Sequence, residues 1–196
     1  MTQKLILASS SKYRANLLSR LNTNFSAIAP EIDESQQNKE RPEDYVKRLS
    51  IEKANIIANE HESSWVIGSD QIAEFEGKML GKPGNFDKAL QQLISFSGKQ
   101  VLFRTGLALV NISENVCHYK ESKTSVHFKT LNQQKITEYL QHDKPYDCAG
   151  SFKIESRGAT LFEKVQSDDP TSLEGLPLIE LCLLFDRCNL NPLVDF

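Results

Sequence analysis

The chain has 196 residues, of which 39% are hydrophobic and 25% charged, the composition of an ordinary soluble globular protein. Its net charge of −3 and pI of about 5.9 provide no general basic field of the kind that attracts DNA or RNA. An anion site must therefore be built locally. The length suits one domain, residues 1–196, with a sizeable core.

No segment is long and apolar enough to span a bilayer, since the longest run, GLPLIELCLLF, is broken by Pro177 and Glu180. The N-terminal MTQKLILASSS lacks the apolar core and cleavage pattern of a signal peptide. The four cysteines form no C-x-x-C pair and no zinc spacing. We expect a cytoplasmic protein with reduced thiols and no nucleic-acid or membrane partner. A homodimer is compatible with this sequence.

Hydrophobic periodicity predicts strands that alternate with helices early and strands that pair with each other later. This order indicates an α/β class, a mixed α+β sheet with some antiparallel strands. In chain order we predict a strand at 4–8, a helix at 11–21, a strand at 25–29, a loop at 31–40, a helix at 42–60, a strand at 64–70, a hairpin at 71–80, a loop at 81–85, a helix at 86–96, antiparallel strands at 100–112 and 116–129, a helix at 131–141, strands at 148–166 and a buried last helix from Pro170.

The turn after the first strand gathers hydrogen-bond donors. A helix start leaves backbone N–H groups unpaired and carries partial positive charge. Ser9, Ser10 and Ser11 add hydroxyls, and Arg14 follows one helical turn later. Arginine matches phosphate oxygens with two parallel hydrogen bonds. The turn therefore predicts an anion site, unless the serines only cap the helix and the cations are solvated.

Carboxylates follow two of the predicted strands. Asp70 ends the apolar strand WVIGS, at the edge where open α/β sheets bind ligands. Asp33 and Glu34 follow the second strand, where a solvated acidic loop is the alternative. Beside a phosphate site, such carboxylates require a divalent cation, and Mg²⁺ favours one or two carboxylates plus phosphate oxygens.

Two lysines are candidates for neutralising phosphate charge. Lys82 stands in the turn L-G-K-P-G, and Lys53 lies at the edge of the apolar stripe of the long helix. For each, a plain surface lysine is the alternative. No P-loop or dinucleotide-binding glycine motif occurs in the chain, so a phosphate would be bound by another design.

Several motifs occur in the order typical of one family. They are L-I-L-A-S-S-S-K-Y-R, A-P-E-I-D-E, I-E-K-A, I-G-S-D-Q, G-K-P, C-A-G-S-F-K-I-E and G-L-P-L, from residue 5 to 178. Each motif is weak alone, but together they are specific. The chain therefore resembles a Maf protein, and its S-D-Q and A-G-S-F-K-x-E motifs resemble the YceF branch.

The resemblance implies a mixed α/β fold similar to that of inosine triphosphatases, with an elongated sheet and two lobes around a deep cleft. It implies a divalent metal cation, Mg²⁺ or Mn²⁺, and a cytoplasmic, house-cleaning hydrolysis of 7-methyl-GTP to 7-methyl-GMP and pyrophosphate. Carried onto matching positions, it implies phosphate binding by Ser9, Arg14, Lys53 and Lys82, proton acceptance by Asp70, metal binding by Glu34 and Asp70, and choice of base by Tyr13, Gln71 and Glu155.

The chain departs from its relatives next to the arginine. Lys12-Tyr13 replaces a common Pro-Trp or Pro-Arg, and Ala15 stands where a second basic residue usually follows. Either phosphate affinity is lower, or Lys12 compensates.

The chemistry of 7-methylguanine suits the three residues assigned to base choice. The base is cationic, and a cation over an aromatic face such as that of Tyr13 gains ~0.5–2 kcal/mol. A carboxylate such as Glu155 can accept both donors of the guanine edge, and Gln71 can reach O6. Alternatively, Glu155 is a surface residue beside the turn at Arg157.

The expected reaction is in-line attack of water on the α-phosphorus. An ordinary aspartate, with a pKa of about 3.9, is a poor base at neutral pH, so Asp70 fits metal binding and water positioning better than proton removal. Two alternatives stay open: a pyrophosphatase for dTTP, UTP or another modified nucleotide, and a nucleotide-binding regulator of cell division without turnover.

Overall fold

The computed structural model describes residues 3–196, which form two compact units. The first unit comprises the residues up to Asp70, Thr105–Ser122 and Asp169–Phe196. The second comprises Gln71–Arg104 and Lys123–Asp168. In chain order the strands and helices are β1 (Leu5–Ala8), α1 (Lys12–Ser19), β2 (Phe25–Ile28), α2 (Pro42–Glu60), β3 (Trp65–Phe75), β4 (Lys78–Leu80), α3 (Phe86–Phe96), β5 (Gln100–Asn111), β6 (Val116–Phe128), α4 (Gln133–Asp143), η1 (Ala149–Ser151), η2 (Arg157–Leu161), β7 (Phe162–Ser167), η3 (Ser172–Glu174) and α5 (Leu178–Arg187).

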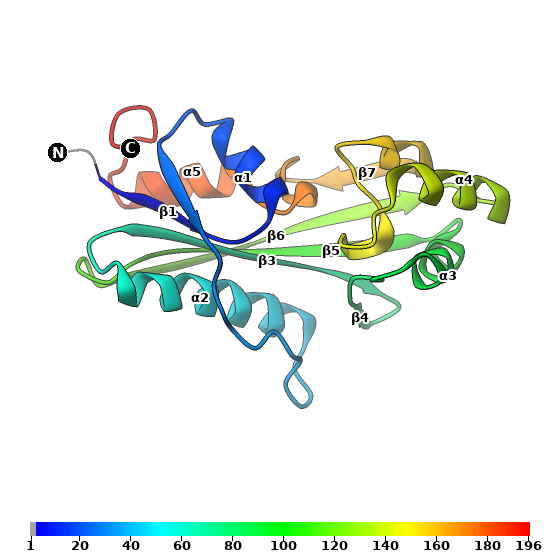
Figure 1. Ribbon diagram of the computed structural model, residues 1–196, viewed down its shortest axis with the longest axis horizontal. Coiled ribbons are helices and arrows are strands. Elements are labelled where there is room, and N and C mark those ends of the chain that lie inside the picture. The colour runs from blue at the N-terminus through cyan, green and yellow to red at the C-terminus, as the bar shows by residue number, and fades with distance from the viewer. Residues whose placement is uncertain (1–2) are drawn as a thin grey trace. The chain divides into compact units, whose positions relative to one another are not determined.

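In the first unit, β1 is hydrogen-bonded in parallel to β2 on one side and to β3 on the other. Leu5 is opposite Phe25 in one pair and Trp65 in the other. The sheet continues through β5 and β6. Within this unit, α2 lies on one face of the sheet, while α1 and α5 lie on the other (Figure 1).

Alternate residues of β1 point to opposite faces of the sheet, and each face has its own core. Leu5 and Leu7 pack with residues of α1 and α5, including Leu17 and Leu181. The other core, on the α2 side, contains Ile6, Ala8, Ala54, Ile57, Ala58, Val66, Ala108 and Val110. All four residues of β1 are buried, as expected for a strand covered on both faces.

Close packing of α2 on β3 depends on Gly68. A Cβ atom at this position would lie 2.1 Å from the backbone oxygen of Ser50 and 2.9 Å from Cβ of Ala54. Any larger residue would push the helix away from the strand. Because Lys53 is on α2 and Asp70 is two residues beyond Gly68, this contact controls the distance between their side chains.

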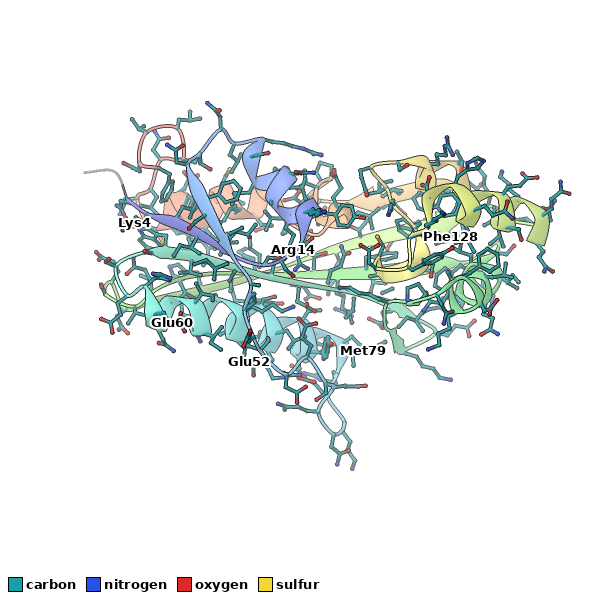
Figure 2. All side chains as sticks on the ribbon, viewed as in Figure 1. Lys4, Arg14, Glu52, Glu60, Met79 and Phe128 are labelled. Carbon is teal, nitrogen blue, oxygen red and sulfur yellow. The ribbon has the colours of Figure 1, made fainter. Side chains whose placement is uncertain are left out.

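In the second unit, β3 forms a hairpin with β4 through Glu76 and Gly77, and β6 pairs antiparallel with β7. Its core is rich in phenylalanine. Phe128 is labelled in Figure 2. Its ring centroid lies 5.1–6.0 Å from those of Phe96, Phe152 and Phe162. Phe103 contacts Phe152 in the same core, with ring centroids 5.2 Å apart.

The mixed α/β class is confirmed. The helices predicted at 42–60 and 86–96 have the predicted bounds, and the hairpin at 71–80 is present. The two long strands β5 and β6 are neighbours joined by residues 112–115, a connection too short for a parallel crossover. Within residues 3–196, no helix is long and apolar enough to cross a membrane.

The prediction of strands over 148–166 is wrong for most of that range. Residues 149–151 and 157–161 form short 3₁₀ helices, and the strand starts at Phe162. Gly150 and Ser151 have φ values of 73° and 61°, a left-handed conformation that cannot extend a strand. The backbone N–H of Gly158 then donates to the carbonyl of Lys153, which closes a turn.

The last helix also differs from its prediction. It begins at Leu178 rather than at Pro170, because the intervening residues form a 3₁₀ turn and Gly175 has a φ of 108°. It is not buried on every side, since Ile179 and Leu183 are 50% and 46% exposed.

Candidate functional site

The turn between β1 and α1 joins two serines to one arginine. Ser11 is the N-cap of α1, and its Oγ accepts a hydrogen bond from the backbone N–H of Arg14 at 3.4 Å. Ser9 is buried, and its Oγ accepts from the backbone N–H of Ser11 at 3.1 Å and from Nη1 of Arg14 at 3.4 Å. Capping therefore accounts for Ser11, whereas Ser9 binds the guanidinium.

Arg14, labelled in Figure 2, is also held by a carbonyl group far along the chain. The Nε of Arg14 donates to the backbone oxygen of Gly175 at 2.9 Å. The buried hydroxyl of Ser69 lies 2.9 Å from the same oxygen and 2.8 Å from that of Gly106. A hydroxyl has one hydrogen, so it donates to one of these carbonyls at a time. The Gly175 carbonyl thus links Arg14 to the residue next to Asp70.

The charges of Asp70 and Glu34 affect the pKa values of side chains on two helices, α1 and α2. Burial lowers the pKa of the Arg14 guanidinium, and the charges of Asp70 and Glu34 oppose that shift. Burial raises the pKa of the Tyr45 phenol to about 12, and the same two carboxylates add to the shift. Both carboxylates therefore interact electrostatically with Arg14 on α1. They also interact electrostatically with Tyr45 on α2.

Lys53 bridges these carboxylates. Its Nζ lies 2.7 Å from Oε1 of Glu34 and 2.7 Å from Oδ1 of Asp70. The side chains of Lys53 and Asp70 are only 6% and 10% exposed, while that of Glu34 is 54% exposed. The alternative of a plain surface lysine is therefore wrong for Lys53. A buried ammonium of this kind requires the opposite charges that it contacts.

The acidic loop that carries Glu34 is attached to α2. The hydroxyl of Tyr45 donates to the backbone oxygen of Glu34 at 2.8 Å. Arg48 donates to the backbone oxygen of Ser35 at 3.1 Å and to the carboxylate of Glu40 at 2.6 and 2.9 Å. These contacts hold the loop on the face of α2 that also carries Lys53, so Glu34 is not simply a solvated loop residue.

Glu34 and Asp70 suit a divalent cation only when further ligands come from outside the chain. Within the described range 3–196, no three His, Cys, Asp or Glu side chains form a group able to hold a metal. The carboxylates of Glu34 and Asp70 both contact one positive group, the Lys53 ammonium. Two carboxylates complemented by phosphate oxygens and water are the donor set that Mg²⁺ prefers.

The other predicted site residues are described in their own surroundings. Tyr13 is half-buried in the first turn of α1. Gln71, Lys82 and Glu155 belong to the second unit: Gln71 is half-buried on β3, and Lys82 and Glu155 are exposed. The roles assigned to these residues, and the cleft between two lobes, stay predictions.

Sequence reasoning missed the residues that hold the site in place. Gly175 contacts the side chain of Arg14, and Tyr45 contacts the backbone of Glu34. Arg48 and Ser69 hold the segments beside them, through the backbone oxygens of Ser35 and Gly175. The distance along the chain explains the omission, since Ser69 and Gly175 are 106 residues apart. The only local signal is the position of Ser69 beside Asp70 in the S-D-Q motif.

Known proteins resemble this chain over nearly its whole length. Residues 4–188 match the family model described as Maf-like protein. A 7-methyl-GTP pyrophosphatase of Pseudomonas syringae pv. tomato is 49% identical over 177 residues, which are 90% of this chain and 92% of that protein. Proteins of the same name from Bordetella pertussis and Colwellia psychrerythraea are 46% and 42% identical, each over 97% of this chain and over 94% and 96% of their own lengths.

Solved structures with little sequence similarity share the fold. The Ham1 protein of Staphylococcus aureus superimposes with a TM-score of 0.53 at 13% identity, covering 94% of this chain and all of that one. A HAM1 protein from Coxiella burnetii gives a TM-score of 0.51 at 13% identity, covering 94% of this chain and 99% of its own.

Proposed function

Because the chain belongs to the Maf-like protein family, we propose that it is a nucleotide pyrophosphatase that hydrolyses 7-methyl-GTP to 7-methyl-GMP and pyrophosphate. The names of relatives that are 42–49% identical support this substrate. The observation that carries the proposal is the close grouping of Arg14, Lys53, Glu34 and Asp70, which gives an acidic chain a local site for a triphosphate.

Arg14 binds the phosphate tail. Its guanidinium is oriented by Gly175 and Ser9 before any ligand arrives, so little side-chain entropy is lost on binding. The buried Lys53 supplies a second positive charge, and Lys82 is proposed as a third from the resemblance. Positive groups that are already oriented stabilise the charge that spreads over the phosphates during the reaction.

Glu34 and Asp70 would hold the divalent cation, Mg²⁺ or Mn²⁺, that the family implies. When bound there, such a cation neutralises phosphate charge and lowers the pKa of a water molecule. The Lys53 ammonium contacts both carboxylates and keeps them together when they hold no metal.

Asp70 orients the attacking water. Its Oδ1 accepts a hydrogen bond from Lys53 at 2.7 Å, and its other oxygen can accept from water or bind the metal. We assign it positioning of the water, with proton acceptance as the second possibility. Attack on the α-phosphorus then expels pyrophosphate.

The base is read by residues that the resemblance assigns. Tyr13 offers an aromatic face to the cationic 7-methylguanine, Glu155 accepts from its two edge donors, and Gln71 reaches O6. A cytoplasmic location is part of the proposal, and a homodimer stays an expectation that sedimentation can test.

Product analysis tests the proposed function. The purified chain is incubated with 7-methyl-GTP and Mg²⁺ or Mn²⁺, and the products are separated by ion-exchange chromatography. Monophosphate plus pyrophosphate is expected. Diphosphate plus phosphate would contradict the reaction, and faster turnover of UTP or dTTP would contradict the base. Asp70→Asn should abolish turnover and leave nucleotide binding largely intact, while loss of both or of neither would refute its assigned role.

A further inference from the structure

The turn that carries Glu155 is attached to α4 by Asp143 and Tyr139. Asp143, the last residue of α4, accepts from Oγ of Ser156 at 3.2 Å on Oδ1 and from the backbone N–H of Arg157 at 3.0 Å on Oδ2. Its backbone oxygen accepts from Nζ of Lys153 at 3.0 Å. Asp143 therefore contacts the chain on both sides of Glu155.

The turn is also closed within itself. The carbonyl of Lys153 accepts from the backbone N–H of Gly158 at 2.9 Å and from that of Ser156 at 3.3 Å. A Cβ atom at Gly158 would lie 2.4 Å from that carbonyl oxygen, so only glycine allows this closure. The backbone N–H of Lys153 donates to the hydroxyl of the buried Tyr139 at 2.9 Å. Hydrogen bonds therefore hold residues 153–158 on both sides of Glu155.

Helix stability does not account for an aspartate at position 143. The C-terminus of a helix carries partial negative charge, so a carboxylate in the last turn is unfavourable there. His142 already supplies the basic residue that suits this end of α4. The Asp143 carboxylate instead hydrogen-bonds to Ser156 and Arg157 in the turn and to the Tyr139 hydroxyl, which itself accepts from the backbone N–H of Lys153.

We propose that Asp143 is a positioning residue for base selection: it holds the 153–157 turn so that the Glu155 carboxylate meets a nucleobase edge that offers two adjacent donors, as guanine does. This inference rests on the proposed function and on the role of Glu155 within it. It adds a residue that touches neither the base nor the phosphates.

The test compares 7-methyl-GTP with UTP, which carry the same triphosphate. The measured quantity is kcat/KM for 7-methyl-GTP divided by kcat/KM for UTP. Glu155→Ala should lower this ratio about 100-fold, Asp143→Ala about tenfold and Ser156→Ala about threefold. Asp147→Ala is the matched control, because it removes an exposed carboxylate four residues away and should change the ratio less than about twofold. Asp143→Ala should also raise KM for 7-methyl-GTP while kcat changes less than about twofold, because the phosphate groups are bound by other residues.

A purely structural role would lower both kcat/KM values together and leave their ratio unchanged. The inference is overturned if Glu155→Ala lowers the ratio and Asp143→Ala behaves like Asp147→Ala. If Asp143→Ala does not fold, the ratio for Ser156→Ala decides in its place. If Glu155→Ala also leaves the ratio unchanged, the inference falls while the pyrophosphatase activity stands. Absence of 7-methyl-GTP hydrolysis by the parent would overturn the proposed function itself.

Discussion

Replacing Lys53 by methionine removes the charge that joins Glu34 and Asp70 while keeping a side chain of similar length. The Asp70 side chain, 10% exposed, would lose its contact at 2.7 Å and keep a negative charge with little access to water. Glu34 is 54% exposed, so water can solvate its carboxylate when Lys53 is gone. The cost should therefore come mainly from Asp70.

Removing one partner of a buried ion pair costs about 3–5 kcal/mol, and the exposure of Glu34 places Lys53→Met near the lower end, at about 3 kcal/mol. For a chain of this length each kcal/mol shifts the melting temperature by about 2–4 °C, so a decrease of about 6–12 °C is expected. A protein of ordinary stability, about 5–15 kcal/mol, would still fold.

Urea unfolding followed by circular dichroism at pH 7 measures this loss. Lys47→Met is the matched control, since Lys47 is an exposed lysine on the same helix. Its ammonium lies 5.8 Å from the centroid of the Tyr119 ring, so its replacement should cost no more than about 1 kcal/mol. Adding Asp70→Asn to Lys53→Met should restore at least about 1.5 kcal/mol, because both charges are then absent. Equal losses for Lys53→Met and Lys47→Met, or strictly additive losses in the double variant, would refute the reasoning.

Arg14→Lys keeps the charge but loses the Nε contact with Gly175, and steady-state kinetics should show kcat/KM for 7-methyl-GTP about 100-fold lower; a change under about threefold would contradict the role of the guanidinium. Glu34→Gln should raise the Mg²⁺ concentration needed for half-maximal activity and lower the melting temperature of the metal-free protein only slightly, because Asp70 still pairs with the Lys53 ammonium; an unaltered Mg²⁺ requirement would exclude Glu34 as a ligand. Hydrogen bonds from Arg48 lower the pKa of Glu40 below its ordinary 4.5, so the pair stabilises the fold above that pH and loses its effect as pH falls through the lower, folded-state value. Arg48→Met should therefore be less stable than the parent at pH 7, with a difference that shrinks below about pH 4.5 in urea titrations, and a difference independent of pH would argue against the pair.

The sequence predicts a helix or strand well when neighbouring residues alone determine its conformation. The helix at 42–60 has proline at its first position and a regular apolar stripe, and α2 has the predicted bounds. The segment 148–161 is predicted as strand, but its conformation depends on contacts with α3 and α4. Ser151, for example, is held in a left-handed conformation with its hydroxyl 2.5 Å from Oε1 of Gln92.

The same distinction applies to the site. The strand-end position of Asp70 and the serine-rich turn before Arg14 are visible in the sequence. The burial of Lys53 follows from the packing of α2 against Gly68, which no spacing along the chain reveals. The Gly175 carbonyl that orients Arg14 is 161 residues away from it, beyond the reach of any periodicity argument.

Hydrolysis of 7-methyl-GTP in oxygen-labelled water, with mass spectrometry of both products, tests the central claim most directly. Attack of water on the α-phosphorus places one labelled oxygen in 7-methyl-GMP and leaves pyrophosphate unlabelled. Label in pyrophosphate or in free phosphate, or no reaction in the presence of Mg²⁺ or Mn²⁺, would contradict it.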